Sequence, residues 1–145
     1  MSFMNGMNIS ASGMTAQRLR MDVISQNIAN VNTTRDENGQ PYRRKEVVFA
    51  EKGASPFGEI LAQTSGIAGT GVKVTQIAQD NKTEMRKVYD PSHPDADADG
   101  YVTYPNVNTV QEMTDLIDAS RSYEANVTAF NATKNMALKG LEVGK

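Results

Sequence analysis

The sequence contains no cysteine and no tryptophan, and only 6% of its 145 residues are aromatic. Without cysteine the chain can form no disulfide, no Cys-ligated zinc site and no thiol nucleophile. Because aromatic side chains are few, any central hydrophobic core must be small. A chain of this length has room for one compact domain and a pair of extended appendages.

A dominant charge of one sign is also lacking, since 15 basic residues stand against 17 acidic ones and the net charge is −2. Nucleic-acid binding needs a clustered basic face, so this balance predicts that nucleic acid is not a partner. The one dense basic run, Arg43-Arg44-Lys45, is interpreted as a solvated turn or strand edge.

Long hydrophobic runs are absent as well. No stretch of about 20 apolar residues occurs, which predicts that the chain does not span a membrane as a helix. The first residues, MSFMNGMNISASGM, have neither a basic region nor a continuous apolar stretch. They predict no cleaved Sec-type signal peptide, so export of this chain requires another route.

Proline is missing from a segment near each end of the sequence, and each of these segments has helical periodicity. In the first, from about Met7 to Val31, small and apolar residues recur at alternating spacings of three and four, as in a heptad seam. Its members are Ile9, Ser12, Ala16, Leu19, Val23, Gln26 and Asn30. A second line lies roughly opposite and consists of Met7, Met14, Met21 and Ile28. Two opposite apolar faces are typical of a helix packed among several others.

The second helical segment begins at Thr109-Val-Gln-Glu112, which matches a capping box. It predicts a helix of ~50 Å at a rise of ~1.5 Å per residue. Two interpretations stay open: a hairpin of two helices folded on each other, or a pair that also packs on other molecules. Polar residues in the seam favour the second. The seam is Met113, Leu116, Ser120, Tyr123, Val127, Phe130, Lys134, Ala137 and Leu141.

Glycine and proline recur between residues 34 and 106 and exclude a long helix there. Short runs between them predict four strands and one helical turn. The strands are Lys45–Ala50, Gly71–Gln79, Glu84–Tyr89 and Tyr101–Tyr104, and the turn is Ser55–Gln63. The predicted fold class is α+β: two terminal α-helices (1–33 and 107–145) form a coiled-coil-like pair, with a small β-rich insert (34–106) between them.

Sites for metals, cofactors or catalysis are predicted to be absent. Asp95, Asp97, Asp99 and Gly100 imitate the start of an EF-hand loop, but the twelfth position is Asn106 rather than Glu, so a solvated acidic loop is favoured. The only histidine, His93, has no second ligand and no nucleophile motif beside it. The glycine-rich run 66–71 lacks the Lys-Ser/Thr of a phosphate-binding loop.

Several longer motifs resemble one family. Ser10–Met14, Gln17-Arg18 and Ser25–Thr33 resemble the N-terminal signature of flagellar rod and hook proteins, and Glu112–Asn126 is similar to the C-terminal helix of that family. Three further segments resemble its proximal rod members: Glu37–Phe49, Asp90–Pro94 and Gly100–Val107. A different rod subunit or a hook-related axial protein is the alternative.

The resemblance implies a structural subunit of the bacterial flagellar basal-body rod, exported uncleaved through the type III apparatus and assembled helically in the periplasmic space. It implies that the terminal helices form the inner layer of a drive shaft and export channel. The implied partners are other rod proteins, copies of the chain itself, ring and adapter components at the rod base, and the export apparatus. The predicted assembly interface is Met14, Leu19, Val23, Asn27, Asn30, Met113, Leu116, Tyr123, Val127, Phe130 and Leu141.

Asparagines cluster where the first helix is expected to end, at positions 27, 30 and 32. Asparagine terminates helices through local hydrogen bonds and a left-handed backbone. A buried asparagine can instead bond across packed helices and fix their axial register. The two roles are compatible, and the sequence leaves both open.

Overall fold

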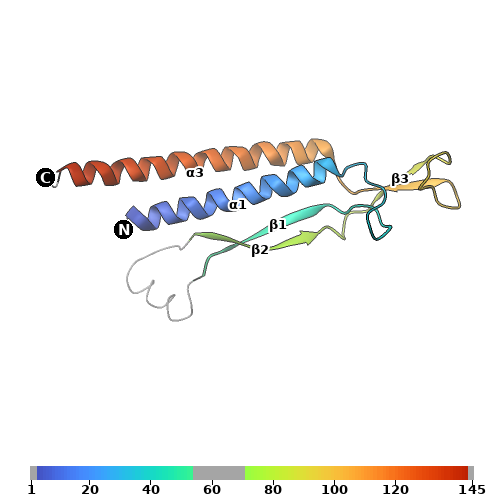
Figure 1. The fold of residues 1–145 in the computed structure, drawn as a ribbon, viewed down its shortest axis with the longest axis horizontal. Helices are drawn as coiled ribbons and strands as arrows, with labels where there is room; N and C mark the ends of the chain where they lie inside the picture. The colour runs from blue at the N-terminus through green and yellow to red at the C-terminus, as the bar shows by residue number, and fades with distance from the viewer. Residues whose placement is uncertain (1–2, 54–70, 144–145) are drawn as a thin grey trace.

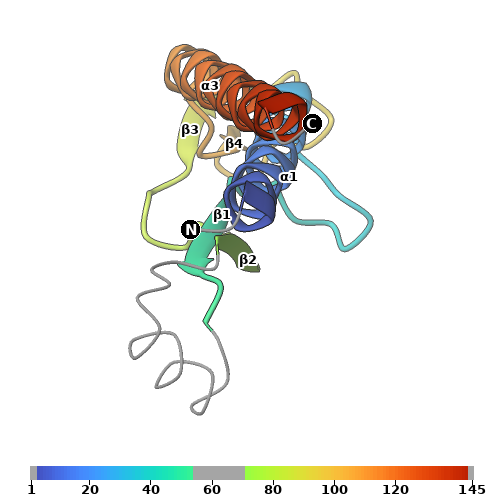
Figure 2. The ribbon, with the colours of Figure 1, turned by 90° about the vertical axis from the view of Figure 1, so that its left-hand side faces the viewer.

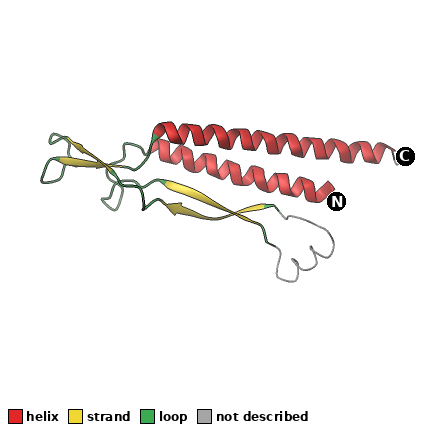
Figure 3. Cartoon of the chain, turned by 180° about the vertical axis from the view of Figure 1, so that it is seen from behind, coloured by secondary structure: helices red, strands yellow, loops and turns green. Residues whose placement is uncertain are grey.

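The computed structural model describes residues 3–53 and 71–143, which form a long, narrow molecule (Figure 1). Its two helices are α1 (Phe3–Ala29) and α3 (Thr109–Val143). The strands between them are β1 (Lys45–Glu51), β2 (Val72–Gln79), β3 (Arg86–Tyr89) and β4 (Tyr101–Tyr104). The predicted fold class, α+β with a terminal helix pair and a small β insert, is confirmed (Figure 3).

The predicted strands agree with the observed ones to within two residues at each end, because glycine and proline mark their limits. The predicted helical turn Ser55–Gln63 lies outside the described residues. The division into parts 1–33, 34–106 and 107–145 stays a prediction.

Helices α1 and α3 pack side by side and antiparallel. Gly6 faces Thr133, Gly13 faces Asn126, and Asn27 is hydrogen-bonded to Glu112. These pairs recur at multiples of seven residues on both helices, the repeat of a coiled coil. The observed seam of α3 differs from the predicted one at every second position. Where Met113, Ser120, Val127 and Lys134 were predicted, the residue one place earlier in the sequence lies in the seam instead. Glu112 and Ala119 are buried, for example, whereas Met113 is 55% exposed.

Two glycines of α1 allow the helices to approach closely, and they differ in the space around them. A Cβ atom at Gly6 would lie 3.5 Å from Thr133 Cγ2, which is an ordinary contact. A Cβ atom at Gly13 would lie 2.7 Å from Asn126 Oδ1 and 3.0 Å from its Cγ. Asn126 is itself held by a hydrogen bond from its Nδ2 to the carbonyl of Ser122. The contact at Gly13 is therefore the tighter of the two.

This difference predicts opposite outcomes for two alanine substitutions. Gly6→Ala is expected to raise the free energy of unfolding by about 0.5–1 kcal/mol, because alanine favours a helix over glycine. Gly13→Ala is expected to give no gain or a loss, because Asn126 must move away. Urea denaturation of both variants measures the difference, and an equal gain would contradict the close packing at Gly13.

Helix α1 forms the middle layer, with α3 on one side and the β1–β2 hairpin on another (Figures 1 and 2). The hairpin is antiparallel and pairs Lys45 with Gln79 and Glu51 with Val72. Ser12 Oγ accepts a hydrogen bond from Val72 N (3.0 Å) and donates one to Ile9 O (2.7 Å). The predicted seam through Ser12, Ala16 and Leu19 thus faces the hairpin rather than α3.

The second ribbon, β3–β4, projects beyond the helix pair at the end opposite the termini (Figure 1). Its register pairs Arg86 with Tyr104 and Tyr89 with Tyr101. Every residue of β3 is exposed.

The core of the described residues is small and nearly as polar as it is apolar. Its buried apolar side chains are Ala16, Val23, Ile24, Val102, Pro105 and Ala119, and its buried polar ones are Ser10, Asn27, Asn106 and Glu112. Hydrophobic burial within one chain is thus limited, as the scarcity of aromatic residues predicts.

Candidate functional site: the helix pair and its polar junction

Asn27 is the centre of a polar junction at the insert end of the helix pair. It is fully buried within α1, two residues before the helix ends. Its Nδ2 donates to Lys45 O and to Glu112 Oε2, both at 2.9 Å. Its Oδ1 accepts from Lys45 N and from Tyr42 OH, also at 2.9 Å. Both donors and both acceptor sites of the amide are used, and they join α1, α3 and β1.

Glu112 is also fully buried, and Arg44 is its counter-ion. Arg44 Nε donates to Glu112 Oε1 at 2.5 Å, and Arg44 also pairs with Glu46 and, at 3.5 Å, with Asp115. A buried carboxylate without a partner is strongly unfavourable, so this ion pair is required by the packing of α3. The interpretation of Arg44 as a solvated residue is wrong: its side chain is only 20% exposed.

The ionisation of the junction follows from these contacts. Burial acts to lower the pKa of Arg44, but the hydrogen bond and charge of Glu112, together with Glu46, raise it above the ordinary value. Burial raises the pKa of Tyr42, and the nearby charge of Glu112 adds to this effect. Arg44 therefore stays cationic and Tyr42 stays a hydrogen-bond donor.

The predicted capping box at the start of α3 is wrong. Asn108 caps the helix, because its Oδ1 accepts hydrogen bonds from Val110 N (3.0 Å) and Gln111 N (3.4 Å). The carboxylate of Glu112 turns inward to Asn27 and Arg44 instead. With Asn108 already satisfying the first amides of the helix, Glu112 is available for the buried ion pair.

A second buried asparagine, Asn106, holds the same stretch of chain from the other side. Its Oδ1 accepts from Arg44 N at 2.9 Å, and its Nδ2 donates to Asp80 O and Thr83 O. Hydrogen bonds from the Thr83 side chain and from the backbone amides of Thr83 and Lys82 lower the pKa of Asp80 to about 2. Residues 44–45 are therefore fixed between Asn27 and Asn106.

Asn30 has the other of the two roles foreseen for the asparagine cluster. Its Nδ2 donates to Gln26 O at 2.9 Å, and its Oδ1 accepts from Thr33 Oγ1 at 3.1 Å. These bonds are local and lie at the end of α1. The left-handed backbone expected of a terminating asparagine is not found, because among the described residues only Gly39, Gly71 and Gly100 have positive φ. Asn27 therefore acts across the packed elements, and Asn30 acts as a helix-terminating residue.

The remaining residues of the predicted interface lie at different depths. Val23 is buried, and Met113 and Leu141 are 55% and 71% exposed. The others are half-buried on the helix pair: Met14, Leu19, Leu116, Tyr123, Val127 and Phe130. Which of these side chains contact another molecule stays a prediction.

One section of the helix pair carries no charge. Residues 3–17 of α1 and 125–133 of α3 include no Asp, Glu, Lys, Arg or His. The register brings these two segments side by side, since Gly6 faces Thr133 and Gly13 faces Asn126. The signal was present in the sequence as two separate uncharged runs, but only the register shows that they coincide.

Large apolar side chains are exposed along the same pair of helices. At the terminal end they are Phe3, Met4, Met136, Leu138 and Leu141, with exposures from 50% to 71%. Near the start of α3, Val110, Met113 and Ile117 are 72%, 55% and 54% exposed. Within the described residues, neither helix is both long and apolar enough to cross a lipid bilayer.

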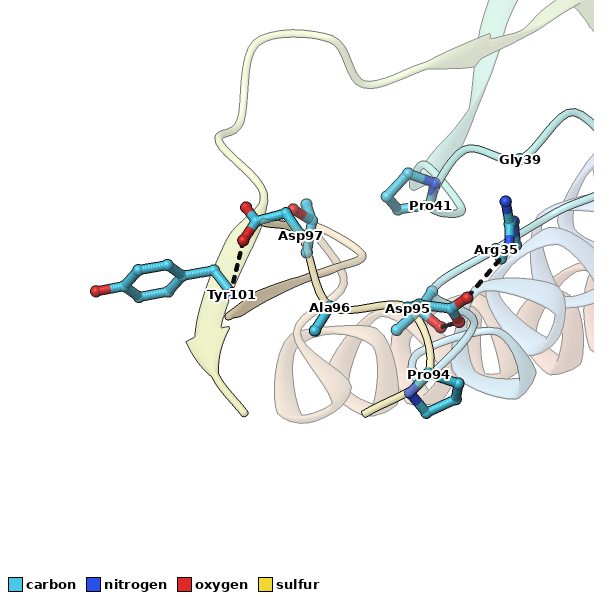
Figure 4. Close-up of a pocket in the computed structure, with 10 residues that line it drawn as sticks. Arg35, Gly39, Pro41, Pro94, Asp95, Ala96, Asp97 and Tyr101 are labelled. Carbon is cyan, nitrogen blue, oxygen red and sulfur yellow. Dashed lines mark hydrogen bonds and ion pairs between the residues drawn. The ribbon is translucent and has the colours of Figure 1, made fainter. Parts of the chain in front are cut away.

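The acidic loop is held by protein groups rather than arranged around a cation (Figure 4). Asp95 accepts a hydrogen bond from Thr34 Oγ1 at 2.8 Å and pairs with Arg35 at 3.5 Å. Asp97 Oδ1 accepts from the amides of Asp99 and Tyr101. Among the described residues, no cluster of three or more His, Asp or Glu side chains is placed to hold a metal ion.

Comparison with known families matches both ends of the chain. Residues 7–35 match the family described as "Flagella basal body rod protein", and residues 98–143 match "Flagellar basal body rod FlgEFG protein C-terminal". The two matched segments contain most of α1 and of α3, the helices that form the coiled-coil-like pair. The class defined by fold and sequence is thus that of the structural flagellar rod proteins.

Curated relatives specify the class further. The chain is 53% identical to the flagellar basal-body rod protein FlgC of Bacillus subtilis, with both chains covered completely. It is 46% identical to FlgC of Borreliella burgdorferi, over 99% of this chain and 98% of the relative. It is 41% identical to FlgC of Salmonella typhimurium, again over the full length of both. The chain belongs to the FlgC family of flagellar basal-body rod proteins.

Proposed function

We propose that the chain assembles helically with its neighbours through α1 and α3, and so builds part of the proximal rod that acts as drive shaft and encloses the export channel. The proposal assigns it no catalytic activity. Two observations carry the proposal: the large apolar side chains that are exposed along α1 and α3, and the uncharged section of the helix pair. A helix surface that faces water is normally charged, so this section fits a position among other helices.

The energetics support a core that is completed by neighbouring molecules. Burial of apolar surface contributes about 25 cal/mol per Å². Among the described residues few apolar side chains are buried within the chain: Ala16, Val23, Ile24, Val102, Ala119 and Pro105. The large side chains that stay exposed on α1 and α3 are available for burial against a neighbour, and this gives assembly its driving force.

The polar junction supports the proposal in a different way. Helical assembly requires every copy to present the same surface, because the contacts are head-to-tail repeats of one interface. Hydrogen bonds of Asn27 to both α3 and β1 fix one axial register of the helix pair. A slip of α3 would separate Glu112 from Arg44, and a slip of α1 would separate Asn27 from Glu112 and Lys45.

The names of the relatives support a location in the flagellar basal body. The proposal places the chain in the periplasmic part of the rod, after export without a cleaved signal through the type III apparatus. Its proposed partners are copies of itself, other rod proteins, and the ring and adapter components at the rod base.

Charges placed on the exposed apolar side chains test the assembly. Ile117→Glu and Leu141→Glu are expected to abolish swimming in a strain whose own gene is deleted, because each puts a carboxylate into an apolar contact. The folded chain should tolerate both, since these side chains are 54% and 71% exposed. Circular dichroism melting of the purified chain checks this point. Asn81→Glu adds the same charge at an exposed loop position and should swim normally.

Normal rods and swimming with both glutamate variants would contradict assembly through these faces. If motility is lost, the melting curves show whether misfolding is the cause, and unchanged unfolding together with lost motility supports the interface.

A further inference from the structure

A groove between α1 and β2 takes no part in the α1–α3 contact. Ala16, Leu19, Val72 and Val74 give it an apolar floor, and its volume is about 450 Å³. Its rim carries three basic side chains, Arg18, Lys52 and Lys73, against one acidic side chain, Asp22. None of the three basic groups forms an ion pair with another described residue. Among the described residues the groove thus combines an apolar floor with a rim of net positive charge.

The turn of the β3–β4 ribbon has the complementary chemistry. Tyr89 and Tyr101 are 64% and 44% exposed, and their rings pack edge to face with centroids 5.3 Å apart. Gly100 has φ +80°, and a Cβ atom there would lie 3.0 Å from Cε2 of Tyr89. The ring of Tyr89 is therefore held against the backbone of the turn although most of it faces solvent. Such a fixed, exposed aromatic pair is typical of an interface anchor.

Charge separates this turn from the other exposed apolar features. Residues 90–100 carry four aspartates and no Lys or Arg. Hydrogen bonds from Ser92 lower the pKa of Asp90, so that carboxylate stays ionised at neutral pH. The exposed ridge of Val110, Met113 and Ile117 lies on a half of α3 that is also mainly acidic, but there Glu112 pairs with Arg44, and Asp115 pairs with Arg20 and Arg44. The ribbon turn is the feature that matches a basic rim.

We propose that the β3–β4 turn of one copy docks into the α1–β2 groove of a second copy. Tyr89 packs on the apolar floor, and the exposed Asp97 and Asp99 of the turn face Arg18, Lys52 and Lys73, whereas Asp95 is paired with Arg35 of its own chain. The proposal rests on the proposed assembly of the chain with itself and names one contact within it. Apolar burial of the aromatic ring supplies affinity, and the opposite charges select orientation.

This contact is heterologous, because the turn and the groove are different surfaces at different positions along the molecule (Figure 1). Each copy has one turn and one groove, so the contact can repeat without closing on itself. It adds a link through the insert to the contacts made by the helices.

Engineered disulfides test the contact. Because the native sequence has no cysteine, a disulfide between two copies can only join the engineered positions. Ala98→Cys in the turn and Lys73→Cys in the groove are produced as separate variants in the same cells, and intact basal bodies are isolated and oxidised. A covalent dimer that contains one copy of each variant is the expected result. The matched control pairs Ala98→Cys with Ala132→Cys, an exposed position on α3, and should give no dimer.

Charge reversal supplies the second measurement. Because Lys73 is itself substituted here, the cysteine in the groove is placed at position 74 (Val74→Cys). Asp99→Lys or Lys73→Glu alone is expected to lower the cross-link yield by up to roughly fivefold, as for one rim ion pair. Combination of the two reversals should restore it.

Swimming cells whose basal bodies give no turn–groove dimer would overturn the docking contact and leave the helix assembly intact. A dimer through Ala132→Cys instead would place the turn on α3 and would also overturn it. The proposal that the chain assembles through its helices is tested separately, because normal swimming of the Ile117→Glu and Leu141→Glu variants would contradict it.

Discussion

Replacement of Asn27 by alanine is expected to lower the free energy of unfolding by about 3–5 kcal/mol. The substitution removes four hydrogen bonds at once, to Lys45 N, Lys45 O, Tyr42 OH and Glu112. Each buried partner that is left unsatisfied costs about 1–3 kcal/mol, and the buried carboxylate is the most costly of them. The loss therefore exceeds that of an ordinary surface substitution several-fold.

Asn30→Ala is the matched control, since Asn30 follows three residues later and, among the described residues, its side chain bonds only to Gln26 and Thr33. Its expected cost is below about 1 kcal/mol, as for the loss of a helix cap. Urea denaturation of the two variants, followed by circular dichroism, gives the comparison. Equal costs would show that Asn27 also acts only locally and would refute its role in fixing the register.

The second large effect is expected at the buried ion pair. Arg44→Ala should cost about 3–5 kcal/mol, because it leaves the fully buried Glu112 carboxylate without its counter-ion. Glu112→Ala should cost less, about 1–3 kcal/mol, because Arg44 keeps Glu46 and Asp115 as partners while the Nδ2 of Asn27 loses one. The double variant Glu112→Leu/Arg44→Met removes both charges and keeps most of the volume. Much of the stability lost in Arg44→Ala is expected to return in it, although the Nδ2 of Asn27 remains without its Glu112 partner. Asp118→Ala, which removes an exposed carboxylate from the same helix, should change stability by less than about 0.5 kcal/mol.

The comparison of single and double variants decides whether the pair acts as a unit. A double variant as unstable as the sum of the two single losses would mean that Glu112 and Arg44 stabilise the chain independently. The expected result is strong coupling, because Arg44 Nε and Glu112 Oε1 are 2.5 Å apart and the carboxylate is fully buried.

Helical periodicity and the positions of glycine and proline were sufficient to predict the fold. Uninterrupted helical spacing predicted α1 and α3, and glycine and proline limited the strands between them. The seam of α3 was predicted one residue away at alternate positions, because a pattern of threes and fours does not distinguish Met113 from Glu112. Sequence periodicity favours the apolar residue, but close contact with α1 and β1 selected the glutamate, which has Asn27 and Arg44 as partners.

The polar junction could not be predicted from local patterns. Glu112 fitted a capping box and Arg44 fitted a solvated basic run, and each interpretation was locally reasonable. Their partners are remote: Asn27 is 85 residues from Glu112, and Arg44 is 68. The asparagine cluster came closer, since both of its roles were foreseen, and only three-dimensional contacts could assign one role to Asn27 and the other to Asn30.

The antiparallel register also orders the folding of the chain. Asn27 and Glu112 are the pair of facing residues nearest in sequence, and each pair farther along the helices closes a longer loop, up to Gly6 with Thr133. Loop closure of this kind costs entropy before any contact forms, and contacts so remote in sequence fold slowly. Once the polar junction has paired, each further pair of facing residues closes only a short additional loop, so we expect pairing to proceed from the junction toward the termini. The uncharged section near the termini is then expected to pair last and to open first, so the surface proposed for assembly is also the part of the chain expected to remain longest without an internal partner.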